Sequence, residues 1–149
     1  MLELNKKLAP GEQFDGVLSL PFHIRQKSRF RAALTDGTPV AVIVERGSVL
    51  RHGDRLVSNC ERIVAIEAQP ERVSDASHDD PQLLARAAYH LGNRHVPVQV
   101  LERTLRYLHD HVLDGMCEQL GLHIATREAR FEPEVGAYHA HTSHSHSHA

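Results

Sequence analysis

The sequence of 149 residues contains only two cysteines, no tryptophan and 5% aromatic residues. Two cysteines are too few for the disulfide framework of a small secreted domain. No apolar run approaches the ~20 residues that a membrane-spanning helix needs, and the segment 1–7 lacks the apolar core of a secretory signal. The formal net charge of −2 does not provide the broad basic field that attracts nucleic acid. We therefore expect a cytoplasmic protein that binds neither membrane nor nucleic acid.

Common catalytic motifs are also missing. The chain has no Gly-x-x-x-x-Gly-Lys-[Ser/Thr] phosphate loop, no His-Glu-x-x-His zinc motif and no Gly-x-Ser-x-Gly nucleophile elbow. Cys60 and Cys117 do not form a Cys-x-x-Cys pair, and we expect both to be buried thiols rather than nucleophiles. The sequence therefore favours a protein that is not an enzyme.

Residues 1–70 have the pattern of a small all-β domain. Two apolar, β-branched runs, 28–34 and 40–45, flank the dipeptide Asp36-Gly37, which is a strong hairpin signal because glycine accepts positive φ. Gly53 marks a second turn, and alternating strands follow it. Short strands at this spacing predict a barrel or sandwich.

Residues 71–135 predict a second domain with the order βαββαβ, typical of a ferredoxin-like fold, so the fold class is α+β. Asp80 and Pro81 are expected to open a helix, and Gly92-Asn93 to end it because both residues tolerate the left-handed conformation. The other expected elements are strands over 72–77, 96–101, 104–113 and 122–127 and a helix over 115–120. The run 104–113 is short enough to be either strand or helix.

Histidine is the residue in excess, with 13 in the chain. Five of them lie in the segment 136–149, which has little apolar content and is expected to be a disordered tail. Neutral imidazoles separated by Ala, Ser or Thr suit Ni, Cu, Zn or Co, and their affinity should fall as pH drops through about 6.5. The alternative is an inert tail or a purification tag. The candidate ligands of the tail are His139, His141, His144, His146 and His148.

His95 follows the expected helix at a helix-to-strand junction, in the sequence Gly-Asn-Arg-His. A single histidine there is commonly a surface or capping residue. It becomes a metal ligand when a twofold axis brings a second copy beside it.

His109 and His111 flank Asp110. On a strand the two imidazoles would share one face and could bind one ion, whereas on a helix they would diverge by ~200°. The alternative on a strand is a solvated polar face.

The chain resembles the urease accessory protein E family, a family of nickel metallochaperones, over essentially its whole length. The resemblance is carried by the hairpin Arg-Phe-Arg to Asp-Gly over 29–37, Leu-Arg-His-Gly-Asp at 50–54, Tyr-His-Leu-Gly-Asn-Arg-His at 89–95, Asp-His-Val-Leu at 110–113 and the histidine-rich end. Gly-Asn-Arg-His in this setting is the specific part, because other nickel proteins also have histidine tails.

The resemblance implies an N-terminal β domain (1–70) that contacts partners, a ferredoxin-like metal-binding and dimerisation domain (71–135) and the tail (136–149). It implies a homodimer in which His95 of both subunits binds Ni(II), with His109, His111 and the tail as further ligands. It implies delivery of Ni(II) as cargo to apo-urease through a GTPase and other urease accessory proteins. From the chemistry of imidazole alone, Zn(II), Cu(II) or Co(II) could also bind. A metal buffer without a client and a metalloenzyme are the competing hypotheses.

Overall fold

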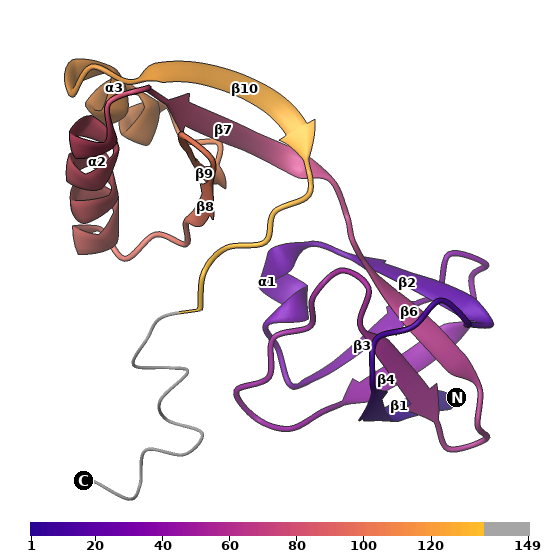
Figure 1. Ribbon diagram of the computed structural model, residues 1–149. Coiled ribbons are helices and arrows are strands. Elements are labelled where there is room, and N and C mark those ends of the chain that lie inside the picture. Colours follow the sequence, from indigo (N-terminus) through magenta and orange to yellow (C-terminus); the bar gives the residue numbers. More distant parts are fainter. Residues whose placement is uncertain (136–149) are drawn as a thin grey trace, which may run out of the picture. The chain divides into compact units, whose positions relative to one another are not determined.

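The chain is described by a computed structural model over residues 1–135, and it forms two compact units. The first unit spans Met1–Gln69 and the second begins at Pro70 (Figure 1). The first is built on strands and the second combines strands with helices, so the predicted α+β class is confirmed.

The first unit is built on a six-stranded sheet in the order β2-β6-β5-β1-β4-β3. β1 pairs in parallel with β4, β2 pairs in parallel with β6, and the other pairs are antiparallel. Leucine, valine and isoleucine side chains from these strands form its core, which is almost fully buried. The elements are β1 (Leu2–Leu8), β2 (Gly16–Leu20), α1 (Phe22–Arg25), β3 (Arg29–Ala33), β4 (Pro39–Ile43), β5 (Arg55–Ser58) and β6 (Ile63–Ala68).

The predicted hairpin at Asp36-Gly37 joins β3 to β4. Gly37 has a φ of +92°, which a residue with a side chain rarely adopts, and the backbone N–H of Thr38 donates to Asp36 Oδ1 at 2.9 Å. The side-chain hydrogen bond from Thr38, then its backbone N–H, lowers the pKa of Asp36, and Arg62 adds to this effect. The local chemistry of the turn therefore sets the register of the two strands.

Two features of the first unit differ from the prediction. The short helix α1 interrupts the expected all-β pattern, and it carries the fully buried Arg25, whose Nε and Nη1 donate to the carbonyl oxygens of Leu20 and Leu50 at 3.1 Å each. Cys60 is exposed, whereas Cys117 in the second unit is buried as expected. Cys60 lies in a tight turn between β5 and β6, where no core is available to cover it.

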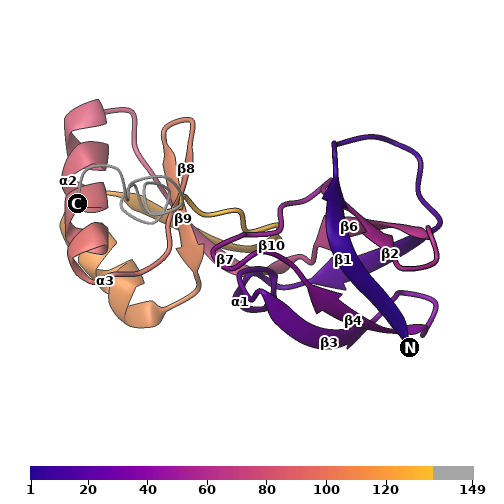
Figure 2. The same ribbon diagram turned by 90° about the horizontal axis from the view of Figure 1, so that it is seen from below.

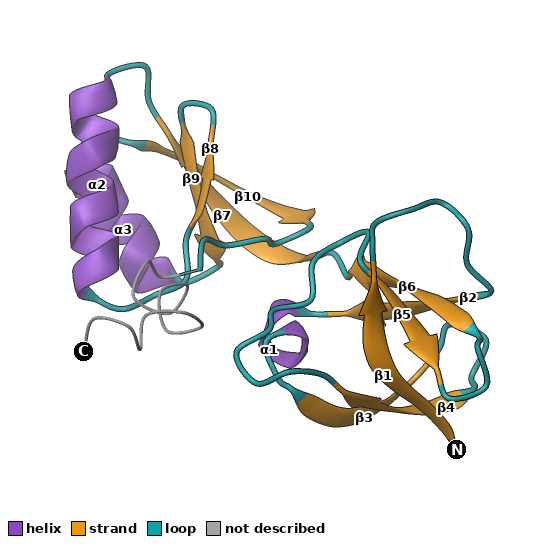
Figure 3. Cartoon of the chain, turned by 60° about the horizontal axis from the view of Figure 1, so that its bottom comes forward, coloured by secondary structure: helices purple, strands orange, loops and turns teal. Residues whose placement is uncertain are grey.

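The second unit is a four-stranded antiparallel sheet in the order β10-β7-β9-β8. The two helices lie on the same face of this sheet, as Figures 2 and 3 show. The chain order β7-α2-β8-β9-α3-β10 with this strand order is the predicted ferredoxin-like βαββαβ fold. The elements are β7 (Glu71–Ser77), α2 (Pro81–Asn93), β8 (Gln99–Leu101), β9 (Thr104–Leu108), α3 (His111–Gln119) and β10 (His123–Ala129).

Helix α2 begins where the sequence predicts. The Asp80 side chain accepts from the backbone N–H of Gln82 at 2.9 Å, and Pro81 occupies the first turn. Ala87 and Leu91 are fully buried against the sheet. The helix ends at Asn93, as predicted. The predicted left-handed conformation of Gly92 and Asn93 is wrong, because both are still helical and the left-handed residue is His95.

The prediction of one strand over 104–113 is also wrong. β9 ends at Leu108 and α3 begins at His111, so the predicted helix 115–120 starts four residues early. The cause is Asp110, whose Oδ1 accepts from the backbone N–H groups of Val112 and Leu113 at 2.8 and 3.2 Å and so starts a helix. β8 is likewise shorter than the predicted strand 96–101, with Pro97 just before it.

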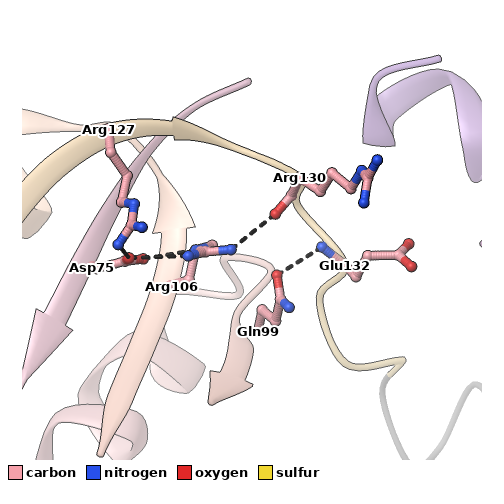
Figure 4. A network of polar contacts seen from close by, with 6 residues as sticks. All are labelled: Asp75, Gln99, Arg106, Arg127, Arg130 and Glu132. Atoms are coloured by element: carbon pink, nitrogen blue, oxygen red, sulfur yellow. Dashed lines mark hydrogen bonds and ion pairs between the residues drawn. The ribbon is translucent and has the colours of Figure 1, made fainter. Parts of the chain in front are cut away.

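The segment 130–135 contacts residues of β8 and β9 on the opposite face of the four-stranded sheet. Asp75 points to this face and makes a bidentate ion pair with Arg106 at 2.7 and 3.0 Å, while Arg127 approaches it at 3.4 Å (Figure 4). Arg106 Nη1 also donates to the carbonyl oxygen of Arg130, and the backbone N–H of Glu132 donates to the Gln99 side chain. These contacts fix the segment that leads into residues 136–149.

Candidate metal site

His95 is placed by a left-handed turn at the end of α2. Its φ is +58°, and the backbone N–H groups of Arg94 and His95 donate to the carbonyl oxygens of Leu91 and Gly92 at 3.1 and 3.0 Å. A residue with a Cβ adopts this conformation at a cost of about 1–2 kcal/mol. Glu61 and Arg103 have the same left-handed conformation, so this turn fixes the direction in which His95 leaves α2 but does not by itself mark a functional site.

The His95 side chain is exposed. Within residues 1–135 its imidazole makes no hydrogen bond or ion pair. One ring nitrogen of a neutral imidazole carries a lone pair, so an exposed ring without a protein partner can donate to a metal ion. The geometry therefore presents His95 as an open, single ligand.

His109 lies between the end of β9 and the start of α3, and its side chain is 28% exposed. Its Nδ1 is 3.3 Å from Oδ2 of Asp114 and 3.1 Å from Oγ of Ser74. The backbone N–H of His109 donates to the carbonyl oxygen of Arg72 at 3.1 Å. One edge of the ring is therefore held by the protein, and Nε2 makes no hydrogen bond within the described chain.

Asp114 is itself held by a buried tyrosine. The hydroxyl of Tyr107, which is 1% exposed, donates to Asp114 Oδ1 at 2.7 Å. Burial, followed by the hydrogen bond to Asp114, raises the pKa of Tyr107, so the phenol keeps its proton and acts as the donor. Burial also raises the pKa of the neighbouring Cys117 thiol. The carboxylate thus has one oxygen for Tyr107 and one for His109.

His111 is the first residue of α3 and is exposed. Because Asp110 caps the helix between the two histidines, His109 and His111 do not share a strand face, and the predicted chelating pair on a strand is wrong. The structure brings His109 together with Asp114 and Ser74 instead.

The described part of the chain contains no group of three or more His, Cys, Asp or Glu side chains that could hold a metal ion. His95, His109 and His111 of one chain therefore do not form such a group. The tail candidates His139, His141, His144, His146 and His148 lie outside the described residues.

Other histidines have structural contacts. Nδ1 of His52 accepts from the backbone N–H of Ala68, and Nδ1 of His78 accepts from that of Asp80. Their lone pairs are already used, which separates them from His95.

Sequence reasoning missed the residues around His109. Asp114 is an acidic residue in the first turn of α3 and could have been found once Asp110 was recognised as a helix cap. No sequence signal connects Ser74 to His109 across 35 positions, because the contact depends on the pairing of β7 with β9.

Residues 1–135 include no helix that is both long enough and apolar enough to cross a membrane.

Comparison with known proteins covers both units. The family model for the N-terminal domain of the UreE urease accessory protein matches residues 4–69, and the model for its C-terminal domain matches residues 71–149. A urease accessory protein UreE of Alkalilimnicola ehrlichii is 51% identical over 138 residues, which are 93% of this chain and 85% of the relative.

Two other relatives with the same name are similar over most of their length. That of Pseudomonas putida strain W619 is 47% identical over 93% of this chain and 86% of the relative. That of Citrobacter koseri is 46% identical over 99% of this chain and 97% of the relative. The chain thus belongs to the UreE family of urease accessory proteins and is an accessory protein rather than an enzyme.

Proposed function

We propose that this protein carries Ni(II) for assembly of the urease metal centre, with the ion held between the His95 side chains of two copies. The observation that carries the proposal is the strained turn that presents an exposed imidazole without a partner in residues 1–135. Membership of the urease accessory family supplies the client. Urease requires a metal centre to be built, and imidazole is a suitable ligand for nickel.

A homodimer follows from the same proposal. A twofold axis close to His95 places the two imidazoles opposite each other without any further ligand in either chain. The second unit also exposes large apolar side chains that a second copy could cover, among them Tyr89 at 66% and Val112 at 54% exposure. Burial of such side chains contributes about 25 cal/mol per Å² of apolar area.

A site of two imidazoles leaves several coordination positions of Ni(II) open. This suits a carrier, which must load an ion and also release it. We propose that His109, His111 and the tail histidines His139, His141, His144, His146 and His148 provide further ligands that complete the shell. Zn(II), Cu(II) and Co(II) compete for the same nitrogen atoms, and Cu(II) should bind most tightly in vitro.

The partners follow from the carrier role. We propose that the protein works in the cytoplasm and passes Ni(II) to apo-urease indirectly, in complexes with the urease accessory GTPase and the other accessory proteins. The first unit, with its own sheet and core, is proposed as the surface that contacts them. The histidine-rich tail favours one alternative, a metal buffer without a client.

Calorimetric titration with Ni(II), combined with native mass measurement, tests the proposal. The full chain is compared with His95→Ala, with a matched exposed control, His123→Ala, and with a full-length variant in which the five tail histidines are glutamine. We expect about one tight ion per two chains, lost in His95→Ala and kept in the other two variants. Loss of all tight binding in the tail variant, with His95→Ala unchanged, would refute the His95 site and favour the buffer.

A further inference from the structure

We propose that Asp114 is a positioning residue that holds the proton of His109 on Nδ1 and thereby presents Nε2 as the metal-binding atom. This inference rests on the proposed function, which places His109 among the nickel ligands. It goes further because it assigns the donor atom of His109 and a role to three residues that are not ligands themselves: Asp114, Tyr107 and Ser74.

The first step locates the proton. Tyr107 donates to Asp114 Oδ1 at 2.7 Å, and Asp114 Oδ2 lies 3.3 Å from Nδ1 of His109. A carboxylate is only an acceptor, so a bare Nδ1 lone pair at this distance would face a second acceptor. The contact is favourable only when Nδ1 carries the proton and donates it. The hydrogen bond of Nδ1 is with the hydroxyl of Ser74 at 3.1 Å, and this hydroxyl can accept from Nδ1–H or donate to a bare Nδ1. The Asp114 carboxylate beside the same nitrogen favours the first of these two arrangements.

The second step concerns the other nitrogen. A neutral imidazole has one N–H, so a proton fixed on Nδ1 leaves the lone pair on Nε2. Nε2 makes no hydrogen bond within residues 1–135, and the His109 side chain is 28% exposed. A carboxylate that accepts from the far nitrogen of a ligating histidine fixes the ring orientation and makes it a better ligand. Asp114 lies within ion-pair distance of Nδ1 before any metal arrives.

The third step identifies a substitution that reverses the effect without changing the shape. In Asp114→Asn, the amide oxygen can still accept from Tyr107, while the amide N–H₂ faces Nδ1 of His109. The amide is a donor, so Nδ1 must now accept and the ring proton moves to Nε2. An Asp→Asn change beside a histidine selects the wrong tautomer in the same way in the serine-protease triad. Size and both contacts are retained, so the fold should persist.

The proton position can be measured without metal. Long-range ¹H–¹⁵N NMR of the full chain, with histidine labelled and the His109 signals assigned by their loss in His109→Ala, distinguishes protonated from unprotonated ring nitrogens. We expect Nδ1–H in the unchanged chain, Nε2–H in Asp114→Asn, and no change in Glu118→Gln, an exposed carboxylate of the same helix. Nε2–H in the unchanged chain would overturn the proposal, and this result needs no variant to fold.

Nickel titration then tests the consequence, in the full-length variant whose tail histidines are glutamine. We expect Asp114→Asn to weaken the Ni(II) bound through His109 by about 10- to 100-fold, with no further effect when His109→Ala is already present. If His109→Ala weakens binding and Asp114→Asn does not, Asp114 has no positioning role. If His109→Ala changes nothing, His109 is not a ligand, which contradicts that part of the proposed function, while the NMR result still decides where the proton lies.

Discussion

Replacement of Asp110 by alanine should destabilise the second unit through the first turn of α3. Asp110 is exposed, so we attribute its contribution to the hydrogen bonds that its side chain accepts from the backbone N–H groups of Val112 and Leu113. Without the carboxylate these donors lose their partner at the helix terminus.

The size of the effect follows from two contributions. Loss of an N-cap costs typically about 1 kcal/mol, within a range of roughly 0.5–2 kcal/mol. Loss of a negative charge at a helix N-terminus costs roughly 0.3–1 kcal/mol more. We therefore expect Asp110→Ala to lower the free energy of unfolding by about 1–2 kcal/mol. Asp110→Asn keeps the capping oxygen and loses only the charge, so about 0.3–1 kcal/mol is expected.

The chain offers a selective probe for this measurement. It has no tryptophan, and the two tyrosines of residues 1–135, Tyr89 and Tyr107, both belong to the second unit. In a Tyr138→Phe background, tyrosine fluorescence during thermal unfolding therefore reports the second unit rather than the sheet of the first. For a domain of this size, 1 kcal/mol corresponds to a shift of roughly 4–8 °C in Tm.

Equal Tm values for Asp110→Ala and the unchanged chain would refute the reasoning. That result is what an exposed residue in the middle of a strand would give, since such changes usually stay within about 0.5 kcal/mol. Equal losses in Asp110→Asn and Asp110→Ala would also count against it, because they would assign the whole effect to charge. The comparison thus tests the helix start that separates His109 from His111.

Three further predictions concern the second unit. Arg106→Ala leaves the carboxylate of Asp75 buried without its bidentate partner and should lower the free energy of unfolding in urea by about 3–5 kcal/mol. Arg127→Ala removes a side chain that is 59% exposed and should lower it by at most about 1 kcal/mol. Equal losses of stability in the two variants would contradict this prediction. The pKa of Tyr107 is raised in the folded unit above its value of about 10 in the unfolded chain. The contribution of Tyr107 to stability is therefore complete below a pH of about 10 and is lost as the pH rises further. In an alkaline titration, Tyr107 should ionise only as the unit unfolds. Gly115 lies in the middle of α3, where an added methyl group would meet open space. Gly115→Ala should therefore stabilise the unit by about 0.5–1 kcal/mol in thermal melts, because alanine favours the helix more than glycine does. A lower Tm of this variant would contradict the prediction.

Those parts of the fold that depend on local chemistry could be predicted from the sequence. The Asp36-Gly37 hairpin and the Asp80-Pro81 helix start are set by residues within a few positions of each other. The run 104–113 was harder, because its first half pairs as a strand and its second half starts a helix. Leu113 and Cys117, four positions apart and both buried, carry the helical period that competes with the strand pattern.

The sequence names candidate ligands but does not predict their arrangement. The family resemblance carried by Gly-Asn-Arg-His makes His95 a candidate ligand, yet its positive φ depends on how α2 ends. The surroundings of His109 combine β7, β9 and α3, so they arise only when the sheet is assembled. The spacing of residues in the sequence shows which side chains are neighbours on one helix or strand, but not which side chains of different elements come into contact.

The segment that crosses the back of the sheet has a consequence for local concentration. The backbone N–H of Glu134 donates to the carbonyl oxygen of Val98 at 2.8 Å, three residues beyond His95. His139 lies five residues after Glu134, and His95 lies three residues before Val98. Even with both stretches fully extended, His139 and His95 can be no more than about 30 Å apart. An imidazole confined to that radius is present at a concentration on the order of millimolar, whatever the concentration of the protein. The covalent chain therefore sets an upper limit on the distance between His139 and His95, and dilution of the protein does not change that limit.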